Sequence, residues 1–399
     1  MGRHGIVCLA ATCGWLAACC APAVWASDVG KRFPAETRVL VDRITGVPLT
    51  ALTKPPANNS KIYQTHPQWT ADGQYIIFRS NRSGGKTQAF AVHELTGDII
   101  QLTEGNTDTG SLNVARKSNR LYFFRGAPEG PTALIELNLD PLLKDSMVGT
   151  PKEPAAYERQ VAVMPAGFRV SGGFTLDADE TKAYSGVSLG DEKGGLRAID
   201  LKTGEVSKIV DVPFRMGHVQ ANPWVSGEIM YCHETGGDAP QRMWFVRADG
   251  TGNRPLYVET PDEWVTHETW IDADHVLFVV MAHLPRLRTK PTGIFCLNLR
   301  NNEVKVLGQV EGRGFWHCNG SADGRWAVGD TFEGSLYLID RASGEITLLT
   351  TGHRMRPDHA HPTFSPDGKR ILIQSGMLSG GTSLDLMVVN VPLWLQVRR

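Results

Sequence analysis

HPQWTADGQYIIF, residues 66–78, returns almost unchanged as HPTFSPDGKRILI, residues 361–373. The two copies lie far apart in the sequence, so they mark a repeated structural unit rather than a duplicated turn. Each copy combines a short first strand, a turn containing Asp and Gly, and an apolar second strand. The repeat therefore predicts an architecture assembled from copies of one small antiparallel unit.

Looser copies of the unit fill the sequence between these two. Successive copies are separated by roughly 45 to 60 residues, which is the length of a four-stranded propeller blade. Strand-like runs such as HVLFVV and RILIQ follow turn residues, and no long helical periodicity competes with them. We predict an all-β fold, a seven-bladed β-propeller of four-stranded antiparallel blades, with a β-solenoid or sandwich as the alternative. The seven copies start near His66, Ser111, Gly172, His218, His267, His317 and His361.

The two ends of the chain each carry an incomplete repeat, and each contains the strands that the other lacks. RVLVDRITGVPLTAL, residues 38–52, matches an outer hairpin but has no inner pair before it. The last repeat continues after residue 375 with LDLMVVNV and lacks an outer hairpin. We therefore expect the N-terminal segment to complete the last blade and close the ring, because closure removes exposed sheet edges.

Residues 1–26 have the features of a secretory leader: Arg3, an apolar stretch at 6–18, and a small-residue cleavage site at 24–26. Leu16-Ala17-Ala18-Cys19 also resembles a lipoprotein box, so lipidation at Cys19 is the alternative to ordinary cleavage. The sequence predicts one propeller domain at 27–399, exported to the periplasm or anchored at the outer membrane. After the leader, no apolar run approaches the ~20 residues of a spanning helix.

The charge balance excludes some classes of partner. With 41 basic and 42 acidic side chains, the chain has no global field to attract nucleic acid or an anionic membrane. Three cysteines remain after the leader, and we expect buried free thiols rather than one disulfide. They are Cys232, Cys296 and Cys318.

Histidine recurs at the start of four consecutive blades: His218, His267, His317 and His361. Equivalent positions converge on the propeller axis, so these imidazoles should meet in one channel. In a strand, residues i and i+2 point the same way, so His359 should join His361 at a single cation, with His267 as a third ligand. Imidazole suits several divalent metals. A hydrogen-bonded histidine cluster in a wet channel is the alternative.

A second polar group surrounds the fourth blade, in FRMGHVQANP (214–223) and YCHETGGDAPQRMW (231–244). His233 follows a predicted strand, and a neutral histidine at a channel mouth can act as a general base. Cationic side chains could add positive charge in this otherwise neutral chain. They are Arg215, Arg242, Arg313, Arg354 and Arg356.

At these motifs the chain resembles the oligogalacturonate lyases, pectate-degrading polysaccharide lyases built on a seven-bladed propeller. The first three blades share only general repeat similarity with that family. The resemblance is carried, in order, by GHVQANP at 217–223, CHE at 232–234, QRMW at 241–244, HETW at 267–270 and HAHPTFSPDG at 359–368.

The resemblance implies a divalent cation, Mn²⁺ above others, bound by His267, His359 and His361. It places the catalytic base on His233 and a carboxylate-binding arginine on Arg215. Where the family has a glutamine before the histidine pair, this chain has Arg356-Pro357-Asp358. That departure would weaken the metal site, transfer a ligand role to Asp358 or water, or mark another substrate. Further expected substrate contacts are His218, Gln220, Arg242, Arg356 and His317.

The implied reaction is β-elimination on an acidic oligosaccharide, with His233 removing the C5 proton while cations stabilise the developing carboxylate charge. Two alternatives remain open. The repeats also look like those of TolB-type propellers, which are non-catalytic periplasmic binding modules, and the substrate could be another uronate oligomer. The Gly-x-Ser-x-Gly match at 186–190 falls within the strand-like run KAYSGVS and opens no helical pattern, so it does not form the strand–turn–helix of a nucleophile elbow, which disfavours a peptidase.

Overall fold

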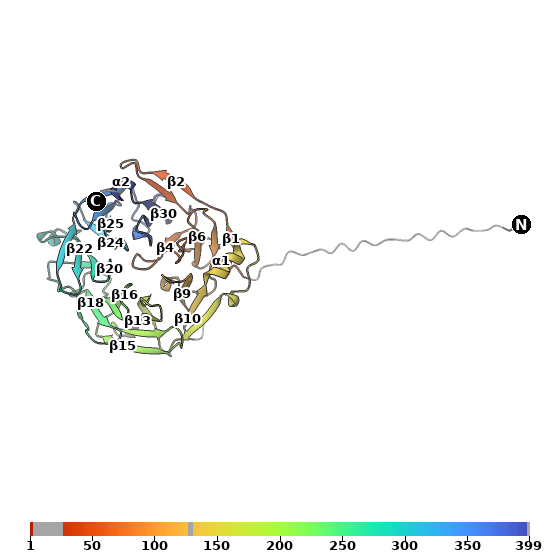
Figure 1. Cartoon of the computed structure of the whole chain (residues 1–399), viewed down its shortest axis with the longest axis horizontal. Helices are drawn as coiled ribbons and strands as arrows, with labels where there is room; N and C mark the ends of the chain where they lie inside the picture. The colour runs from red at the N-terminus through yellow and green to blue at the C-terminus, as the bar shows by residue number, and fades with distance from the viewer. Residues whose placement is uncertain (3–26, 127–130, 397–399) are drawn as a thin grey trace.

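The computed structural model describes residues 1–2, 27–126 and 131–396. Seven antiparallel sheets stand around a common axis, each sheet forming one blade (Figure 1). This confirms the predicted seven-bladed propeller. Two blades have five strands rather than the expected four, because N-terminal strands add to the outer edges of the first and last blades.

Within each blade the chain runs from the axis outward. The innermost strands are β4 (Asn59–Lys61), β8 (Asn113–Val114), β12 (Val170–Leu176), β16 (Met216–Ala221), β20 (Val265–Trp270), β24 (Phe315–Gly320) and β28 (Thr363–Phe364). The second strands are β5 (Tyr75–Ser80), β9 (Arg120–Arg125), β13 (Lys182–Gly190), β17 (Glu228–His233), β21 (His275–Val280), β25 (Trp326–Thr331) and β29 (Arg370–Ser375).

The outer strands complete the blades. The third strands are β6 (Gln88–His93), β10 (Ala133–Asn138), β14 (Lys193–Asp200), β18 (Met243–Arg247), β22 (Gly293–Asn298), β26 (Leu336–Asp340) and β30 (Asp385–Asn390). The fourth strands of blades one to six are β7 (Ile99–Gln101), β11 (Glu158–Val163), β15 (Val206–Val212), β19 (Arg254–Pro255), β23 (Val304–Gly308) and β27 (Ile346–Thr350). Short helices lie outside the sheets: α1 (Leu139–Met147), α2 (Leu393–Gln396), and the 3₁₀ turns η1 (Thr109–Ser111), η2 (Pro154–Ala156) and η3 (Pro285–Thr289).

The ring is closed as predicted. Strands β2 (Arg38–Val41) and β3 (Pro48–Ala51) form a hairpin, and β3 pairs with β30 in the last blade. The two-residue strand β1 (Arg32–Phe33) adds a fifth strand to the first blade by pairing with β7. Segments from opposite ends of the sequence are thereby joined in one sheet, and this pairing closes the ring.

The core lies between neighbouring blades. Side chains of β5 and β9, such as Ile77 and Phe123, pack together in one cluster, and each further pair of blades forms a comparable cluster. Middle strands are covered on both faces, so β21 is buried from Val276 to Val280. This is why HVLFVV is a continuous apolar run rather than an alternating one.

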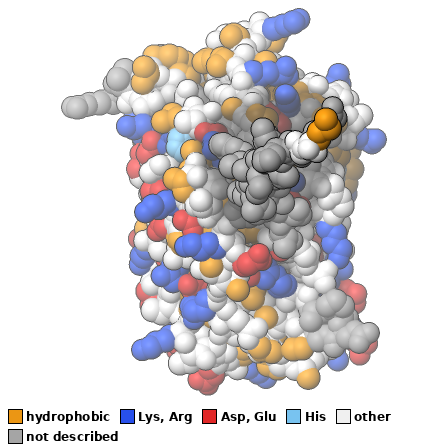
Figure 2. Space-filling model, turned by 90° about the vertical axis from the view of Figure 1, so that its right-hand side faces the viewer, with side chains coloured by type: hydrophobic (Ala, Val, Ile, Leu, Met, Phe, Trp, Pro, Cys, Tyr) orange, Lys and Arg blue, Asp and Glu red, His pale blue; other side chains and the backbone are white. Residues whose placement is uncertain are grey.

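The surface and the cysteines agree with the sequence. Basic and acidic side chains are interspersed over the visible face in Figure 2, as the balanced composition requires. The three described cysteines are free and buried, which confirms the expected thiols. The leader and Cys19 lie outside the described residues. Among the helices of the described part, none has both the length and the hydropathy needed to cross a bilayer.

Candidate active site

Three of the blade-start histidines have an unusual backbone. His218, His267 and His361 have φ angles of 46°, 53° and 48°, in the left-handed region that non-glycine residues rarely occupy. At His218 and His267 the pairing register of the inner strand shifts, which identifies a β-bulge. A bulge redirects the side chain at its position, and such bulges concentrate near functional sites. Here they help gather the imidazoles of different blades.

The four blade-start imidazoles follow one another around the axis. The ring centroids of His267 and His317 are 4.1 Å apart, and those of His317 and His361 are 3.9 Å apart. His218 continues the row at 6.2 Å from His267. The predicted convergence of histidines in one channel is therefore present in the structure.

Three of these rings direct Nδ1 at an oxygen atom. His267 Nδ1 contacts the carbonyl oxygen of Trp316, His317 Nδ1 lies 3.2 Å from Asp330, and His361 Nδ1 lies 2.8 Å from Gln64 Oε1. A metal-bound histidine is usually held this way, with one nitrogen bonded to an oxygen acceptor and the other free for the ion. In this arrangement the Nε2 atoms are the candidate ligand atoms.

Asp330 is a second organising group of the cluster. Its carboxylate accepts the backbone N–H groups of His317, Ala360 and His361, which ties β24 to the start of the last blade. With His317 and His359 it forms a group whose potential ligand atoms all lie within 4.8 Å of one another. Burial raises the pKa of Asp330. The cluster thus contains carboxylate as well as imidazole ligands.

His359 and His361 do not share a strand face as the sequence suggested. The inner strand starts only at Thr363, and the positive φ of His361 turns the chain, so the two ring planes are 83° apart. His359 instead stacks on the Trp316 ring at 4.5 Å, and its buried Nδ1 has no hydrogen-bond partner. Both rings nevertheless lie close to His317: the ring centroid of His359 is 5.5 Å from that of His317, and the centroid of His361 is 3.9 Å from it.

Burial keeps three rings of the histidine cluster, those of His267, His317 and His359, uncharged. Desolvation lowers the pKa of His267 and of His317 well below the ordinary value, and the neighbouring imidazoles lower both further. The pKa of His359 is also lowered, first by desolvation. Neutral imidazoles have a free lone pair, so these rings are in the state that binds a cation.

A network of charges lies beside the cluster on blades four and five. Arg242 is 3% exposed, and its guanidinium lies 3.2 Å from Glu268 and 3.7 Å from Glu234. His218 Nδ1 lies 3.2 Å from Glu268 but without the alignment of a hydrogen bond. Although burial opposes its charge, Arg242 and then His218 hold the pKa of Glu268 below its ordinary value. Arg242 is therefore already neutralised by carboxylates within the protein.

His233 ends β17 at the same end of the channel as the bulged histidines. Its ring stacks on Phe214 with centroids 4.4 Å apart and remains partly exposed. Desolvation, and then the charge of Arg242, lower its pKa, so the ring is neutral near pH 7. Arg215 donates from Nε to the carbonyl oxygen of Glu234, and its terminal nitrogens have no partner among the described residues. A neutral base and an available guanidinium are thus placed close together.

The remaining predicted substrate contacts differ in accessibility. Gln220 is buried, and its amide donates to the carbonyl oxygen of Glu268, which makes it part of the wall between blades four and five. His317 is also buried, inside the cluster. Arg356 is exposed on the loop before His359. Asp358, which directly precedes His359, accepts a hydrogen bond from the Gln374 amide, and its carboxylate lies 3.2 Å from His361 Nε2.

Sequence reasoning missed three members of the site. Asp330 and Glu268 were not singled out, although each is an acid within a strand buried at that position, Asp330 after the run WAVG and Glu268 beside the blade-start histidine His267. Tyr63 was also missed, and its ring contacts His218 and His361 edge-on, each at 5.2 Å. It follows β4 in a segment that has no repeat counterpart.

Comparisons with known proteins agree on one family. The family model described as oligogalacturonate lyase matches residues 27–340. The oligogalacturonate lyase of Dickeya dadantii is 23% identical, over 92% of this chain and 99% of that protein. The oligogalacturonide lyase of Pectobacterium atrosepticum is 22% identical over the same shares.

Solved structures show the same architecture. An oligogalacturonate lyase in complex with manganese superposes with a TM-score of 0.78 at 22% identity, covering 92% of this chain and 99% of that one. An oligogalacturonate lyase from Vibrio parahaemolyticus gives 0.76 at 20% identity, with the same coverage. The propeller domain of a Pyrococcus furiosus protease reaches only 0.54.

Proposed function

Since the chain belongs to the oligogalacturonate lyase family, we propose that it cleaves short oligogalacturonates by metal-dependent β-elimination. The observation that carries the proposal is the row of imidazoles beside neutral His233 and Arg215, the constellation that abstraction of a proton next to a carboxylate requires. The protein would be exported, as the leader motif at 1–26 indicates.

The residues present fit a divalent cation. His359 has a buried, unpartnered nitrogen, and His267 and His361 have Nδ1 atoms fixed by oxygen acceptors. We assign these three as ligands, with His317 and the carboxylate of Asp358 or Asp330 as further candidates. Manganese accepts mixed nitrogen and oxygen ligands, and a similar structure is a complex with manganese. When bound, the ion would supply Lewis-acid stabilisation of carboxylate charge.

The protein's own groups account for proton removal and orientation. Arg215 would bind the C6 carboxylate of a uronate through its free terminal nitrogens, in the bidentate manner of guanidinium–carboxylate pairs. Neutral His233 would then take the proton from C5. The C5–H electrons form the C4–C5 double bond, the C4–O bond breaks, and the departing oxygen accepts a proton. An unsaturated uronate results, and no water is consumed.

The test is a continuous assay of short oligogalacturonates with Mn²⁺, following the ultraviolet absorbance of a 4,5-unsaturated uronate. We expect the signal to fall about 100-fold or more in His233→Ala, because a general base contributes 10²–10⁴-fold. His93→Ala, a partly exposed histidine on β6 outside the site, is the matched control and should retain activity. Chelation should also abolish the signal.

Other outcomes would redirect the assignment. If no absorbance appears on galacturonates while the protein retains Mn²⁺, other uronate oligomers become the substrates to test. If neither activity nor metal binding is found, the proposal is wrong, and a non-catalytic binding propeller of the TolB type replaces it.

A further inference from the structure

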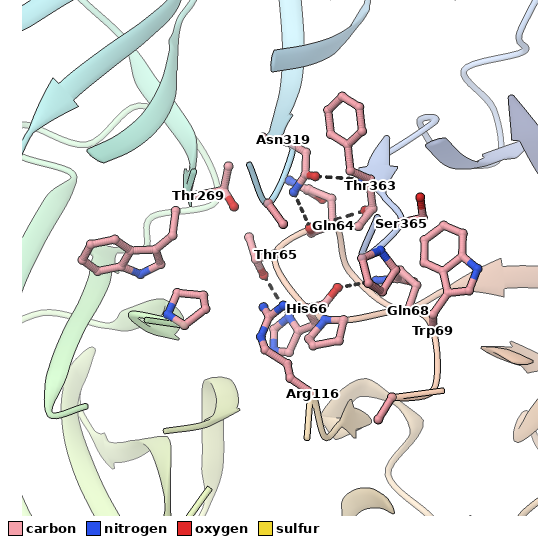
Figure 3. A pocket seen from close by; sticks show the side chains of 18 of the residues that line it. Gln64, Thr65, His66, Gln68, Trp69, Arg116, Thr269, Asn319, Thr363 and Ser365 are labelled. Carbon is pink, nitrogen blue, oxygen red and sulfur yellow. Dashed lines mark hydrogen bonds between the residues drawn. The ribbon is translucent and has the colours of Figure 1, made fainter. Parts of the chain in front are cut away.

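A second cavity lies at the other mouth of the channel. It has a volume of about 260 Å³ and is lined by residues at the far ends of the inner strands (Figure 3). His218 and His267 lie nearer the starts of β16 and β20. Trp270 ends β20, three residues beyond His267. No step of the proposed reaction uses this cavity.

A plug separates the cavity from the histidine cluster. It is the segment 62–68 between β4 and β5, in which Gln68 donates to the carbonyl oxygens of Tyr63 and His66. His66 Nε2 contacts the carbonyl oxygen of Phe174 at 2.7 Å, which anchors the plug to blade three. On one side the plug presents Tyr63 to the histidines, and on the other it presents His66 to the cavity.

Arg116 supplies positive charge to the cavity. Figure 3 shows its side chain beside His66, and within the described residues its guanidinium has no hydrogen bond or ion pair. The surrounding protein lowers the pKa of Arg116 to about 10 by desolvation, against the opposing charge of Glu180, so the group is cationic at neutral pH. Glu180 itself accepts the backbone N–H groups of Arg116 and Lys117. Arg116 is exposed by surface area, and an accessible guanidinium of this kind at the edge of a cavity favours a carboxylate or another planar anion.

The wall contains polar atoms that lack partners. Gln68 Oε1 and Trp270 Nε1 are buried and have no hydrogen bond within the described residues, and their residues are 1% and 5% exposed. An unsatisfied buried polar atom costs about 1–3 kcal/mol, so a ligand that reached these atoms with a donor and an acceptor would stabilise the wall. A hydroxylated ligand can supply both.

The apolar part of the wall consists of flat rings. Three indoles, those of Trp69, Trp224 and Trp270, line the cavity together with Pro223 and Pro366. Trp224 is 42% exposed, which is high for so large an apolar side chain. Trp69 and Trp270 are buried at 2% and 5%, so Trp224 offers the exposed indole. An exposed indole beside amides, hydroxyls and one guanidinium matches the alternating apolar and polar surfaces of a sugar acid.

We propose that this cavity is a second saccharide site that binds one acidic sugar, with its carboxylate on Arg116 and its ring among the tryptophans. Pockets for drug-sized ligands occupy ~300–1,000 Å³, so a cavity of about 260 Å³ fits one ring rather than an oligomer. The inference goes beyond the proposed lyase reaction, because neither Arg116 nor the tryptophans have a role there. A uronate released at the histidine end would be such a ligand.

The experiment is isothermal titration of the mature protein with D-galacturonate, and with D-galactose as the uncharged analogue. We expect binding of galacturonate to His233→Ala, because the second site does not involve that residue. Arg116→Gln should weaken it about 10-fold or more, since a hydrogen bond to a charged group contributes about 1.5–3 kcal/mol. Galactose should bind about as weakly to wild-type protein as galacturonate does to Arg116→Gln.

A second variant keeps the test decisive if Arg116→Gln is poorly folded. Trp224→Ala removes an exposed ring and should also weaken galacturonate binding without loss of lyase activity. Galacturonate binding that is unchanged in both variants, or undetectable in wild-type protein, would refute the second site. Loss of lyase activity on all uronates with Arg116-dependent binding intact would refute the proposed function alone.

Discussion

Asp385 lies where the ring closes, and burial disfavours the ionised form of its carboxyl group. It is fully buried at the start of β30, and its Oδ1 accepts hydrogen bonds from Thr53 and Asn59 of the N-terminal segment. Its other oxygen, Oδ2, has no partner. Desolvation raises the pKa of this carboxyl to about 6.

The direction of the pH effect follows from this shift. An unfolded aspartate has a pKa of about 3.9, so the folded protein prefers the protonated form of Asp385. Its favourable contribution is fully present below the unfolded pKa and is lost as the pH rises through about 6. A shift of about two units corresponds to about 3 kcal/mol, of which about 2 kcal/mol is lost between pH 4 and pH 8.

The perturbation is Asp385→Asn, which cannot titrate. The free energy of unfolding of this variant, relative to wild type, should rise by about 2 kcal/mol between pH 4 and pH 8. Any fixed cost of the unpartnered amide cancels, because only the change with pH is compared. Urea unfolding at pH 4, 6 and 8, read by fluorescence, measures it.

Asp200→Asn is the matched control. Hydrogen bonds from the Thr203 and Lys202 backbones lower the pKa of Asp200, so its contribution is present above the unfolded pKa and lost as the pH falls. Relative to wild type, that variant should be nearly flat between pH 4 and pH 8, because the loss falls below pH 4. Parallel pH profiles for wild type and Asp385→Asn would refute the reasoning, because they would show that Asp385 is ionised in the folded protein without cost.

Three further predictions test the site. Arg242→Met should destabilise the fold by about 3–5 kcal/mol in urea unfolding, because it leaves the buried Glu268 carboxylate unpaired, whereas exposed Arg313→Met should have little effect. Mn²⁺ at about 100 times its Kd should stabilise wild type by about 2.7 kcal/mol in thermal unfolding, and loss of the shift in His359→Ala would support its ligand role. The His267→Gly variant should have a free energy of unfolding up to about 1 kcal/mol higher than His267→Ala, because φ is positive at this position. At His317, where φ is not positive, glycine should have no such advantage over alanine. Equal differences at the two positions would contradict the strain argument.

The fold could be predicted because its information is local and repeated. The turn and apolar strand of 66–78 recur at 361–373, and the complementary deficits of the terminal segments predict closure. Strand β1 could not be predicted, because two residues have no periodicity. Blade one was placed too late: its inner strand begins at Asn59, and the plug then separates this strand from the repeated HPQW motif.

The site was predictable only where it follows the repeat. The four blade-start histidines converge because equivalent positions in a propeller do so, and the sequence shows that equivalence directly. Gln64 and His361 are 297 residues apart in sequence, and no spacing rule joins them. The positive φ angles could not be read from the sequence either, so the prediction that His359 and His361 share one face of a strand was wrong.

The residue at the bulge of the inner strand can be compared between blades, and the comparison distinguishes the requirements of folding from those of the site. In blade three Gly172 occupies it with φ 79°, next to a register shift, and meets the backbone requirement without a steric cost. Blades four, five and seven place histidine there, in a conformation that costs about 1–3 kcal/mol per residue. Histidine also brings a buried polar ring that must be kept neutral, as the lowered pKa of His267 shows. Both features oppose stability where glycine would suffice, so the imidazoles at this position are explained by binding rather than by folding.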